Sequence, residues 1–380
     1  MNNQTYTPNE EPPKRQSQTS KIWIPTLVLL ILALFLIFQE NKNASPKNAD
    51  IPTPIPGSQN ALETLLYTQL PALVADADHG DWSLDEVQFN EDYTQALLWM
   101  AESEEEDGEV IPREPEIVLA IWNTTDQVWH LHLVSDEDFS DIFMSSDFKD
   151  SELAMRFFPD ADPKPGPTTG PVYGGYRLPW TAGLTKRLTW SVGHTSCNPI
   201  YYCTYAFDFA DGTMFDLLAS KGGYVYHWRD TCNNGDSGCT NSITLQDRTT
   251  SPWTYQIYLH IAKNSIPANL KTQGVYVSQG MKIANVDDTG ASTGHHVHLM
   301  VVEQSTLNSC TNYCFGRAVD ITFQDVSINW HAATQGGRPR LEEEASWYGG
   351  EGQRYYVSGN TPQELDYKII LFPIYTNSTK

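Results

Sequence analysis

Residues 290–301 read Gly-Ala-Ser-Thr-Gly-His-His-Val-His-Leu-Met-Val, a glycine-rich turn with three histidines and then an apolar run. The run is typical of a β-strand, in which side chains alternate between two faces, so His296 and His298 should point the same way. Neutral imidazole is a common zinc ligand, and such a pair can present one ring to a metal and the other to a reacting water. Two polar residues on the solvent face of a strand would give the same pattern, so the chain must supply further ligands.

The composition favours a β-rich protein and argues against some partners. The chain has 380 residues, enough for two domains, and 40% hydrophobic residues, enough for real cores. It holds 11 Trp, 19 Tyr and 14 Phe with many Gly and Pro, which favours strands with long turns. The net charge of −23 argues against nucleic acid or anionic lipid as a main partner, because both would repel the protein.

Six cysteines form three pairs that are close in sequence, namely Cys197/Cys203, Cys232/Cys239 and Cys310/Cys314. Local pairing of this kind favours disulfide bonds made in an oxidising compartment. A structural zinc site is the alternative, although no pair has the Cys-x2-Cys spacing that is typical of one.

Residues 21–39 are predicted to form a transmembrane signal-anchor, because the mainly apolar run within them is near the short limit for a membrane span. Basic residues precede the run, so residues 1–20 form a disordered cytoplasmic tail and the C-terminal body lies outside the cell membrane. Residues 40–57 are a Pro-rich, extended spacer. Cleavage as a signal peptide, followed by secretion, is the alternative.

Residues 58–158 are predicted to form a small α+β domain of unknown role. The expected elements are a helix at 61–75, strands at 82–89 and 93–100, a hairpin of 117–122 with 128–134, and a helix at 139–158. A second His-x-His pair, His130 and His132, alternates with Trp129 and Leu131 as in an ordinary half-buried strand, and we assign it no metal.

Residues 159–175 carry five prolines and four glycines and are predicted to be a linker. Short aromatic strands separated by turns follow, so we expect residues 176–380 to form a mainly β domain with antiparallel sheets.

Three more residues of this second domain could carry chemistry. His194 opens the loop that holds the first cysteine pair, and Asp208 lies between two phenylalanines on an apparent strand. A buried carboxylate costs several kcal/mol unless it is paired or binds a metal. Capping of the next turn is the alternative for Asp208. His260 lies within another aromatic strand, where a histidine is more often a satisfied core residue.

Together the residues predict a catalytic zinc site, with one Zn²⁺ per chain. His194, Asp208 and His298 make a set of two histidines and one carboxylate, which with water gives the open tetrahedral site of a catalytic zinc. His260 and His296 would flank the water. Zinc lowers the pKa of such a water to about 7 and polarises a carbonyl, while one histidine takes the proton and the other stabilises the oxyanion.

Residues 178–335 resemble the lysostaphin-type zinc metallopeptidases, which cut peptides of the bacterial cell wall. The family's second motif reads Gly-x-Ser-Thr-Gly-x-His-x-His, and the chain matches it at Gly290, Ser292, Thr293, Gly294, His296 and His298. Tyr258-Leu259-His260 is similar to the strand that bears the family's first catalytic histidine. The resemblance implies that His260 and His296 are catalytic and that His298 is a zinc ligand.

The chain departs from the family pattern in two places. Most members have His-x3-Asp, but here Thr204 stands four residues before Asp208 and the nearest upstream histidine is His194. The branch of staphylolysin and β-lytic metallopeptidase lengthens this loop to a similar extent, so the departure indicates that branch. His295 replaces the usual small or apolar residue, and we expect it on the opposite face of the strand from its neighbour His296.

The leading hypothesis is therefore a membrane-anchored or exported zinc endopeptidase that acts on cell-wall peptidoglycan or Gly-rich protein and has no nucleic-acid partner. The alternative is a non-catalytic scaffold that binds cell wall and activates another hydrolase. A structural surface protein, with the histidines on a strand face, is a third hypothesis. The scissile bond and the oligomeric state do not follow from the sequence.

Overall fold

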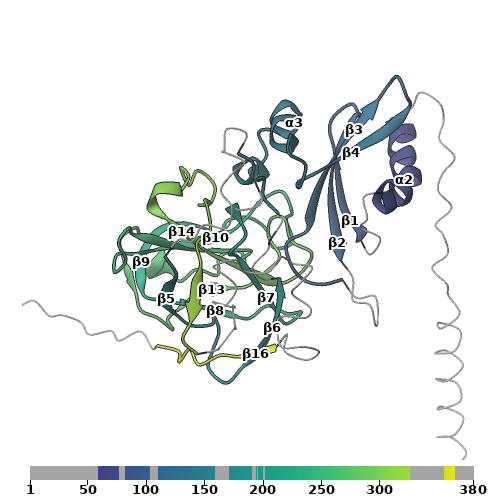
Figure 1. Cartoon of the computed structure of the whole chain (residues 1–380). Helices are drawn as coiled ribbons and strands as arrows, with labels where there is room; N and C mark the ends of the chain where they lie inside the picture. Colours follow the sequence, from purple (N-terminus) through teal and green to yellow (C-terminus); the bar gives the residue numbers. More distant parts are fainter. Residues whose placement is uncertain are drawn as a thin grey trace, which may run out of the picture. The chain divides into compact units, whose positions relative to one another are not determined.

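A computed structural model describes residues 59–76, 82–102, 110–158, 171–190, 194, 196–199, 202–325 and 355–363 (Figure 1). All of these described residues belong to one compact unit. The predicted anchor at 21–39 and the spacer at 40–57 lie outside the described residues, as does most of the predicted linker at 159–175. Within the described part of the chain, no helix is both long and apolar enough to cross a membrane.

The C-terminal part is built on one eight-stranded antiparallel sheet. In spatial order its strands are β12 (Tyr276–Val277), β9 (Gly223–Arg229), β10 (Ser242–Asp247), β11 (Thr254–Leu259), β14 (His296–Glu303), β7 (Phe207–Ala210), β6 (Thr185–Trp190) and β16 (Tyr355–Val357). The expected mainly β domain with antiparallel sheets is thus present.

Two small sheets and two short 3₁₀ helices accompany the large sheet. The pairs are β13 (Lys282–Asn285) with β8 (Asp216–Leu218), and β15 (Ile321–Phe323) with β5 (Tyr173–Tyr176), of which the second pair is parallel. The 3₁₀ helices are η3 (Ala268–Leu270) and η4 (Gln304–Thr306).

Strand β14 lies at the centre of the large sheet, between β11 and β7. All its residues but the last are buried. Side chains of successive residues point to opposite faces of a strand, so Val297, Leu299 and Val301 share one face while His296 and His298 share the other. The apolar residues of β14 belong to the main hydrophobic core. Core packing therefore fixes the register in which the histidines are presented.

The N-terminal part is a four-stranded antiparallel meander with a helix on each face. The strands, in order, are β1 (Trp82–Phe89), β2 (Gln95–Glu102), β3 (Glu116–Asn123) and β4 (Val128–Leu133). Helix α2 (Gln59–Asp76) packs on the face that carries Leu98, and α3 (Phe139–Ser145) packs on the face that carries Leu97 and Trp99 (Figure 1). Covering on both faces explains why the interior residues of β2 are all buried.

One element of this part was predicted wrongly. Instead of a single helix over 139–158, α3 ends at Ser145 and a 3₁₀ helix, η1 (Glu152–Arg156), follows after a turn. The physical reason lies at Ser146, whose extended backbone (ψ of 171°) ends the helix and whose hydroxyl bonds back to the carbonyl of Phe143 at 2.7 Å.

The three predicted disulfide bonds are present: Cys197–Cys203, Cys232–Cys239 and Cys310–Cys314. Among the described residues no cysteine is free. The alternative of a cysteine-bound structural zinc is therefore wrong.

Candidate active site

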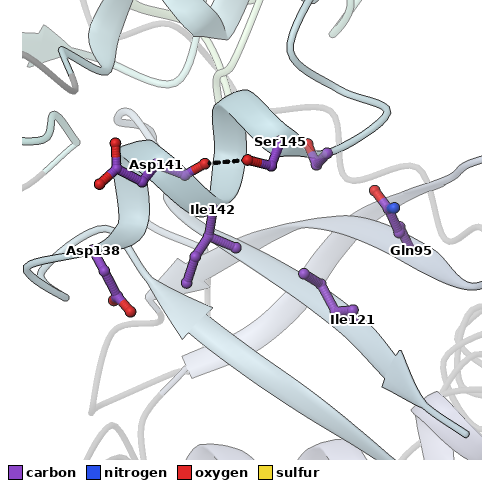
Figure 2. Close-up of a pocket in the computed structure, with 7 residues that line it drawn as sticks. Gln95, Ile121, Asp138, Asp141, Ile142 and Ser145 are labelled. Atoms are coloured by element: carbon purple, nitrogen blue, oxygen red, sulfur yellow. Dashed lines mark hydrogen bonds between the residues drawn. The ribbon is translucent and has the colours of Figure 1, made fainter.

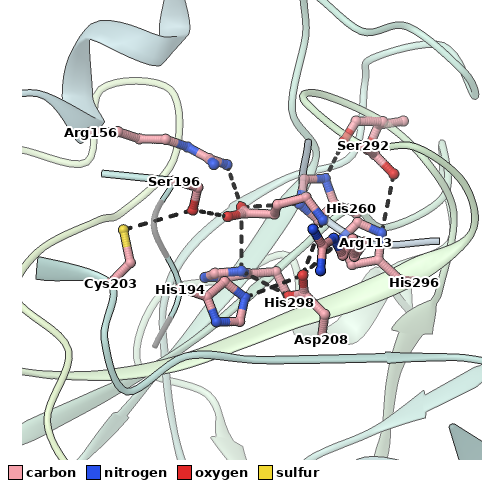
Figure 3. Close-up of polar contacts among 12 residues, drawn as sticks. Arg113, Arg156, His194, Ser196, Cys203, Asp208, His260, Ser292, His296 and His298 are labelled. Atoms are coloured by element: carbon pink, nitrogen blue, oxygen red, sulfur yellow. Dashed lines mark hydrogen bonds and ion pairs between the residues drawn. The ribbon is translucent and has the colours of Figure 1, made fainter. Parts of the chain in front are cut away.

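The register of the large sheet places a carboxylate beside a histidine (Figure 3). His298 on β14 pairs with Asp208 on β7 and, on its other side, with Leu259 at the end of β11. Nδ1 of His298 lies 3.0 Å from Oδ1 of Asp208, and both side chains are fully buried. His260 directly follows Leu259, so the chain brings it to the same row of the sheet.

His194 reaches the same carboxylate from the loop that follows β6. Its ring stacks on Trp190 with 4.4 Å between centroids, and its Nε2 lies 3.2 Å from Oδ2 of Asp208. The Cys197–Cys203 disulfide bridges the loop that returns from His194 to Asp208. His194 therefore lies beside Asp208 even though the two residues do not have the His-x3-Asp spacing.

His260 lies just outside the strand in which we expected it. Strand β11 ends at Leu259, and His260 has a backbone φ of 60°, which is uncommon for a residue other than glycine. The backbone N–H of Asp287 donates to the carbonyl of His260 at 2.7 Å. Packing thus holds His260 in a conformation that strand alternation would not give, as is common at functional sites.

His260 and His296 lie together, with 4.5 Å between ring centroids. Nδ1 of His260 is 2.6 Å from the carbonyl oxygen of Thr289, and Nδ1 of His296 is 2.9 Å from that of Gly294. Because a carbonyl oxygen only accepts, each Nδ1 donates, and the neutral ring keeps its lone pair on Nε2. Nε2 of His296 is 3.7 Å from Oδ2 of Asp208, so that lone pair faces the cluster.

A further carboxylate, Glu114, belongs to the cluster, and the sequence analysis did not identify it. It comes from the segment between β2 and β3 of the N-terminal part and is fully buried. Its Oε1 lies 3.3 Å from Nδ1 of His298 and 3.5 Å from Nε2 of His260. Its backbone N–H donates to Asp208 at 3.0 Å, and Arg156 pairs with its carboxylate at 2.6 Å.

Burial keeps two of the histidines neutral. It lowers the pKa of His296 to about 3, although the nearby Asp208 opposes this change. Burial also lowers the pKa of His298 from its usual value, opposed by Glu114 and Asp208. Both rings are therefore unprotonated at pH 7, as a proton acceptor or a metal ligand must be.

The two carboxylates stay ionised in spite of burial. Burial alone would raise the pKa of Asp208, but the neighbouring His194 and His296 hold it well below the usual value. In Glu114, burial has the same effect, and the Arg156 guanidinium overcomes it, so the pKa is again well below normal. The cluster thus presents anionic oxygens at neutral pH.

The donor set fits a divalent cation. One ligand atom each from Glu114, His194 and His298 lies within 4.8 Å of the others, and Asp208 contacts both histidines. With His296 and His298 neutral, the two buried carboxylates have Arg156 as a fixed cation beside them. Nitrogen and oxygen donors at this spacing suit zinc.

The remaining histidines singled out in the sequence lie elsewhere. His295 precedes β14, and its Nδ1 is 3.3 Å from Oδ1 of Asp287. His130 and His132 lie on β4, where His130 is exposed and 3.4 Å from the side-chain amide of Asn123. None of these three contributes an atom to the metal-binding group around His298.

A surface pocket on the N-terminal part is separate from this cluster. It is lined by Gln95, Ile121, Asp138, Asp141, Ile142, Ser145 and Ser146 (Figure 2). Its wall includes the turn of α3 in which the Ser145 hydroxyl donates to the carbonyl of Asp141 at 2.8 Å. The pocket holds no histidine, and we assign it no role in the chemistry.

No protein-family model and no curated protein matches the chain. Solved structures do. The catalytic domain of the antimicrobial peptidase lysostaphin from Staphylococcus simulans is 22% identical, with a TM-score of 0.24, and the match covers 40% of this chain and 86% of that one.

Two other solved structures are similar at the same level. A mutant catalytic domain of the prophage-encoded M23 protein EnpA from Enterococcus faecalis is 21% identical with a TM-score of 0.25, and the match covers 36% of this chain and 88% of that one. A chain of the SpoIIQ–SpoIIIAH pore-forming complex is 18% identical with a TM-score of 0.21, over 29% of this chain and 60% of that one. Scores of this size are low, so the function rests on the geometry of the site.

Proposed function

We propose that the protein is a zinc-dependent endopeptidase. The observation that carries the proposal is the buried convergence of His194, Asp208 and His298 next to a pair of histidines whose Nε2 atoms face the same cluster. His194, Asp208 and His298 would hold the metal. When bound there, zinc lowers the pKa of a water ligand and polarises the carbonyl of a peptide.

His260 and His296 then supply the proton chemistry. Each ring is oriented by an Nδ1–H bond to a backbone carbonyl, so each neutral ring can accept a proton at Nε2. Once protonated, the same Nε2–H can donate to the oxyanion or to the leaving amine. The two rings come from neighbouring segments, so they can share these roles across one substrate.

The substrate that we propose is peptide of the cell-wall peptidoglycan or Gly-rich protein, with the body of the chain outside the membrane and tethered by residues 21–39. The support is the match of residues 290–298 to the Gly-x-Ser-Thr-Gly-x-His-x-His motif. The disulfides are consistent with an oxidising compartment.

The alternative of a non-catalytic scaffold has less support. Relatives that only bind are expected to lose a ligand or a catalytic histidine, and here all five positions are filled and close together. Metal content and turnover must therefore be measured together, because the scaffold and the enzyme differ in turnover.

The test is the zinc content of the purified chain, measured by atomic spectroscopy, with amine release from peptidoglycan and glycine-rich peptides. We expect one zinc per chain and, for His298→Ala, loss of both zinc and turnover, because removal of one ligand leaves too few donors. A wild-type chain that holds no stoichiometric zinc after purification, and binds none when zinc is added back, would overturn the proposal.

A further inference from the structure

A second group of titratable side chains lies beside the candidate active site and has no part in the chemistry described so far. Asp287 and Asp288 come shortly after β13, and His295 directly precedes β14. One ligand atom from each of the three residues lies within 4.8 Å of the others. The two ends of the glycine-rich turn thus bring together two carboxylates and an imidazole, and this group shares no residue with the metal-binding group around His298.

Asp287 is the member of this group that most needs a partner. Its side chain is fully buried, and neither of its carboxylate oxygens has a hydrogen-bond partner among the described residues. Burial, together with the neighbouring Asp288 carboxylate, raises the pKa of Asp287 to about 7. A carboxylate that is buried without hydrogen bonds is strongly unfavourable as an anion, so this one calls for a proton or a cation.

His295 does not meet this need as a simple ion-pair partner. Its Nδ1 lies 3.3 Å from Oδ1 of Asp287 and 3.8 Å from Oδ1 of Asp288, yet this atom too is buried and has no hydrogen-bond partner among the described residues. A protonated ring would bring one positive charge to two carboxylates, and no lysine or arginine in the described part of the chain pairs with either of them. Donor atoms that face one another without hydrogen bonds are arranged as metal ligands are.

The distances suit one small divalent ion. Two donors that bind a metal at about 2.1 Å in tetrahedral geometry lie about 3.4 Å apart, close to the two separations at His295 Nδ1. The side chains of His295 and Asp288 are 32% and 31% exposed, so water can complete the coordination. Two carboxylates with one imidazole suit zinc or manganese better than calcium, which takes oxygen ligands.

The backbone of Asp287 joins the two histidines that we propose to handle protons. Its N–H donates to the carbonyl of His260 at 2.7 Å, and its carbonyl accepts from the N–H of His296 at 3.3 Å. An ion bound by the side chains of Asp287 and His295 would therefore hold the turn together at its base, next to both of these histidines.

We infer that Asp287, Asp288 and His295 form a second site for a divalent transition-metal ion, and that the bound ion fixes the backbone between His260 and His296. The role of that backbone in catalysis rests on the proposed peptidase function, whereas the ion site does not. The site has three protein ligands and two of them are partly exposed, so it binds more weakly than the buried zinc site and fills when the ion is added.

The test adds Mn²⁺ to the zinc-loaded full chain and measures bound ion from the loss of the free-Mn²⁺ signal in electron paramagnetic resonance. Mn²⁺ has lower affinity than zinc for sites with nitrogen ligands, so zinc should stay in its own site, and atomic spectroscopy checks this. We expect one Mn²⁺ per chain in the wild type. In His295→Ala the affinity should fall by about tenfold or more, because even the loss of an outer-shell partner costs about ten- to a hundredfold.

Asp288→Asn is the second variant, since it keeps the shape of a partly exposed side chain and disturbs the fold least. It should show a similar loss of Mn²⁺ affinity. His130→Ala removes an exposed histidine of β4, and as the control it should bind Mn²⁺ as the wild type does.

Hydrogen exchange followed by mass spectrometry gives the second readout, from a peptide that contains the amides of Asp287 and His296. An ion that binds only the closed turn lowers the population of its open form. At a Mn²⁺ concentration that saturates only the wild type, exchange of this peptide should slow by about tenfold or more in the wild type and stay unchanged in Asp288→Asn. Peptides of α2 are the internal reference.

The outcomes separate the second site from the proposed zinc site. A zinc-loaded wild type that binds no stoichiometric Mn²⁺, or that binds it no better than His295→Ala and Asp288→Asn, overturns the second site and leaves the peptidase function standing. Mn²⁺ binding without slower exchange at Asp287 and His296 overturns the link to the histidines. A chain that holds no zinc, but whose Mn²⁺ binding is lost in both variants, overturns the peptidase function and supports the second site.

Discussion

The two histidines that we propose to handle protons differ from His298, a proposed metal ligand, in how their rings are held. Backbone carbonyls of Thr289 and Gly294 accept from the Nδ1 atoms of His260 and His296. In His298 it is Nδ1 that faces Asp208. At His260 and His296 the backbone carbonyls thus decide that Nε2 is the nitrogen that faces the site.

Replacement of His260 should separate these roles. In His260→Ala the metal ligands remain, so we expect one zinc per chain but a fall in kcat of about 10²–10⁴, the usual contribution of a positioned acid or base. Both kcat and zinc content are measured on the same preparation of each variant.

His130→Ala is the matched control, since it removes a histidine of the other His-x-His pair, on β4. It should leave both kcat and zinc unchanged. Loss of zinc from His260→Ala would show that His260 is a ligand and would contradict its assigned role.

Most of the residues of the site could be predicted from sequence, but Glu114 could not. The histidines and Asp208 are carried by buried strands or by a motif with fixed spacing. Glu114 lies between Pro112 and Pro115 in what reads as an ordinary loop, and it meets Asp208 across a separation of 94 residues. The available signal was an Arg-Glu pair next to rigid prolines, which no local rule connects to a distant metal site.

At the scale of elements, β14 contributes to both the core and the candidate site, because its two faces carry different side chains. Val297, Leu299 and Val301 point to one face of the strand, and the two site histidines point to the other. Because β14 is paired on both sides, by β11 and β7, its register cannot slip without moving the site.

Truncation of the apolar face should therefore weaken the fold without touching a ligand. For Leu299→Ala, which is fully buried, we expect the free energy of unfolding to fall by about 3 kcal/mol, from lost burial and the cavity left behind. Chemical denaturation at fixed zinc concentration measures this change.

Leu184→Ala is the control for this experiment, since Leu184 is 51% exposed. Its effect should stay within about 0.5 kcal/mol. Equal losses in the two variants would mean that β14 is not part of the stability-determining core.

Elements with strong patterns were predictable and elements set by capping were not. The hairpin of β3 and β4 and the helix α2 follow from apolar periodicity, and α2 forms in spite of Pro71. The helix expected over 139–158 fails because side-chain bonding at Ser146 competes with continued helix. Such competition depends on local side-chain hydrogen bonds, which a periodic pattern does not record.

For the whole molecule, metal binding and the contact that residues 110–116 make with the site should be thermodynamically linked. Glu114 contacts His298 and its backbone N–H donates to Asp208, so metal binding should tighten this contact, and the contact should in turn help to retain the metal. Without the cation, two buried carboxylates share one region with less positive charge to hold them.

Removal of zinc by a chelator should therefore loosen the contact of residues 110–116 with the site. We expect faster hydrogen exchange at the backbone amides of Glu114 and Thr293, and a lower unfolding midpoint that zinc restores in a concentration-dependent way. Hydrogen exchange followed by mass spectrometry, with peptides of α2 as the internal reference, checks this. Unchanged exchange at 110–116 after complete loss of zinc would contradict the linkage.

The order of these parts along the chain has a consequence for the cell that makes the protein. Glu114 precedes all five residues that would bind metal or carry protons, which begin at His194 and end at His298. A ribosome adds residues from the N-terminus, so the N-terminal domain emerges on the order of tens of seconds before the last site residue. The five site residues therefore come together on an N-terminal domain that has already been made, and the buried contacts of Glu114 are available from the moment the site forms.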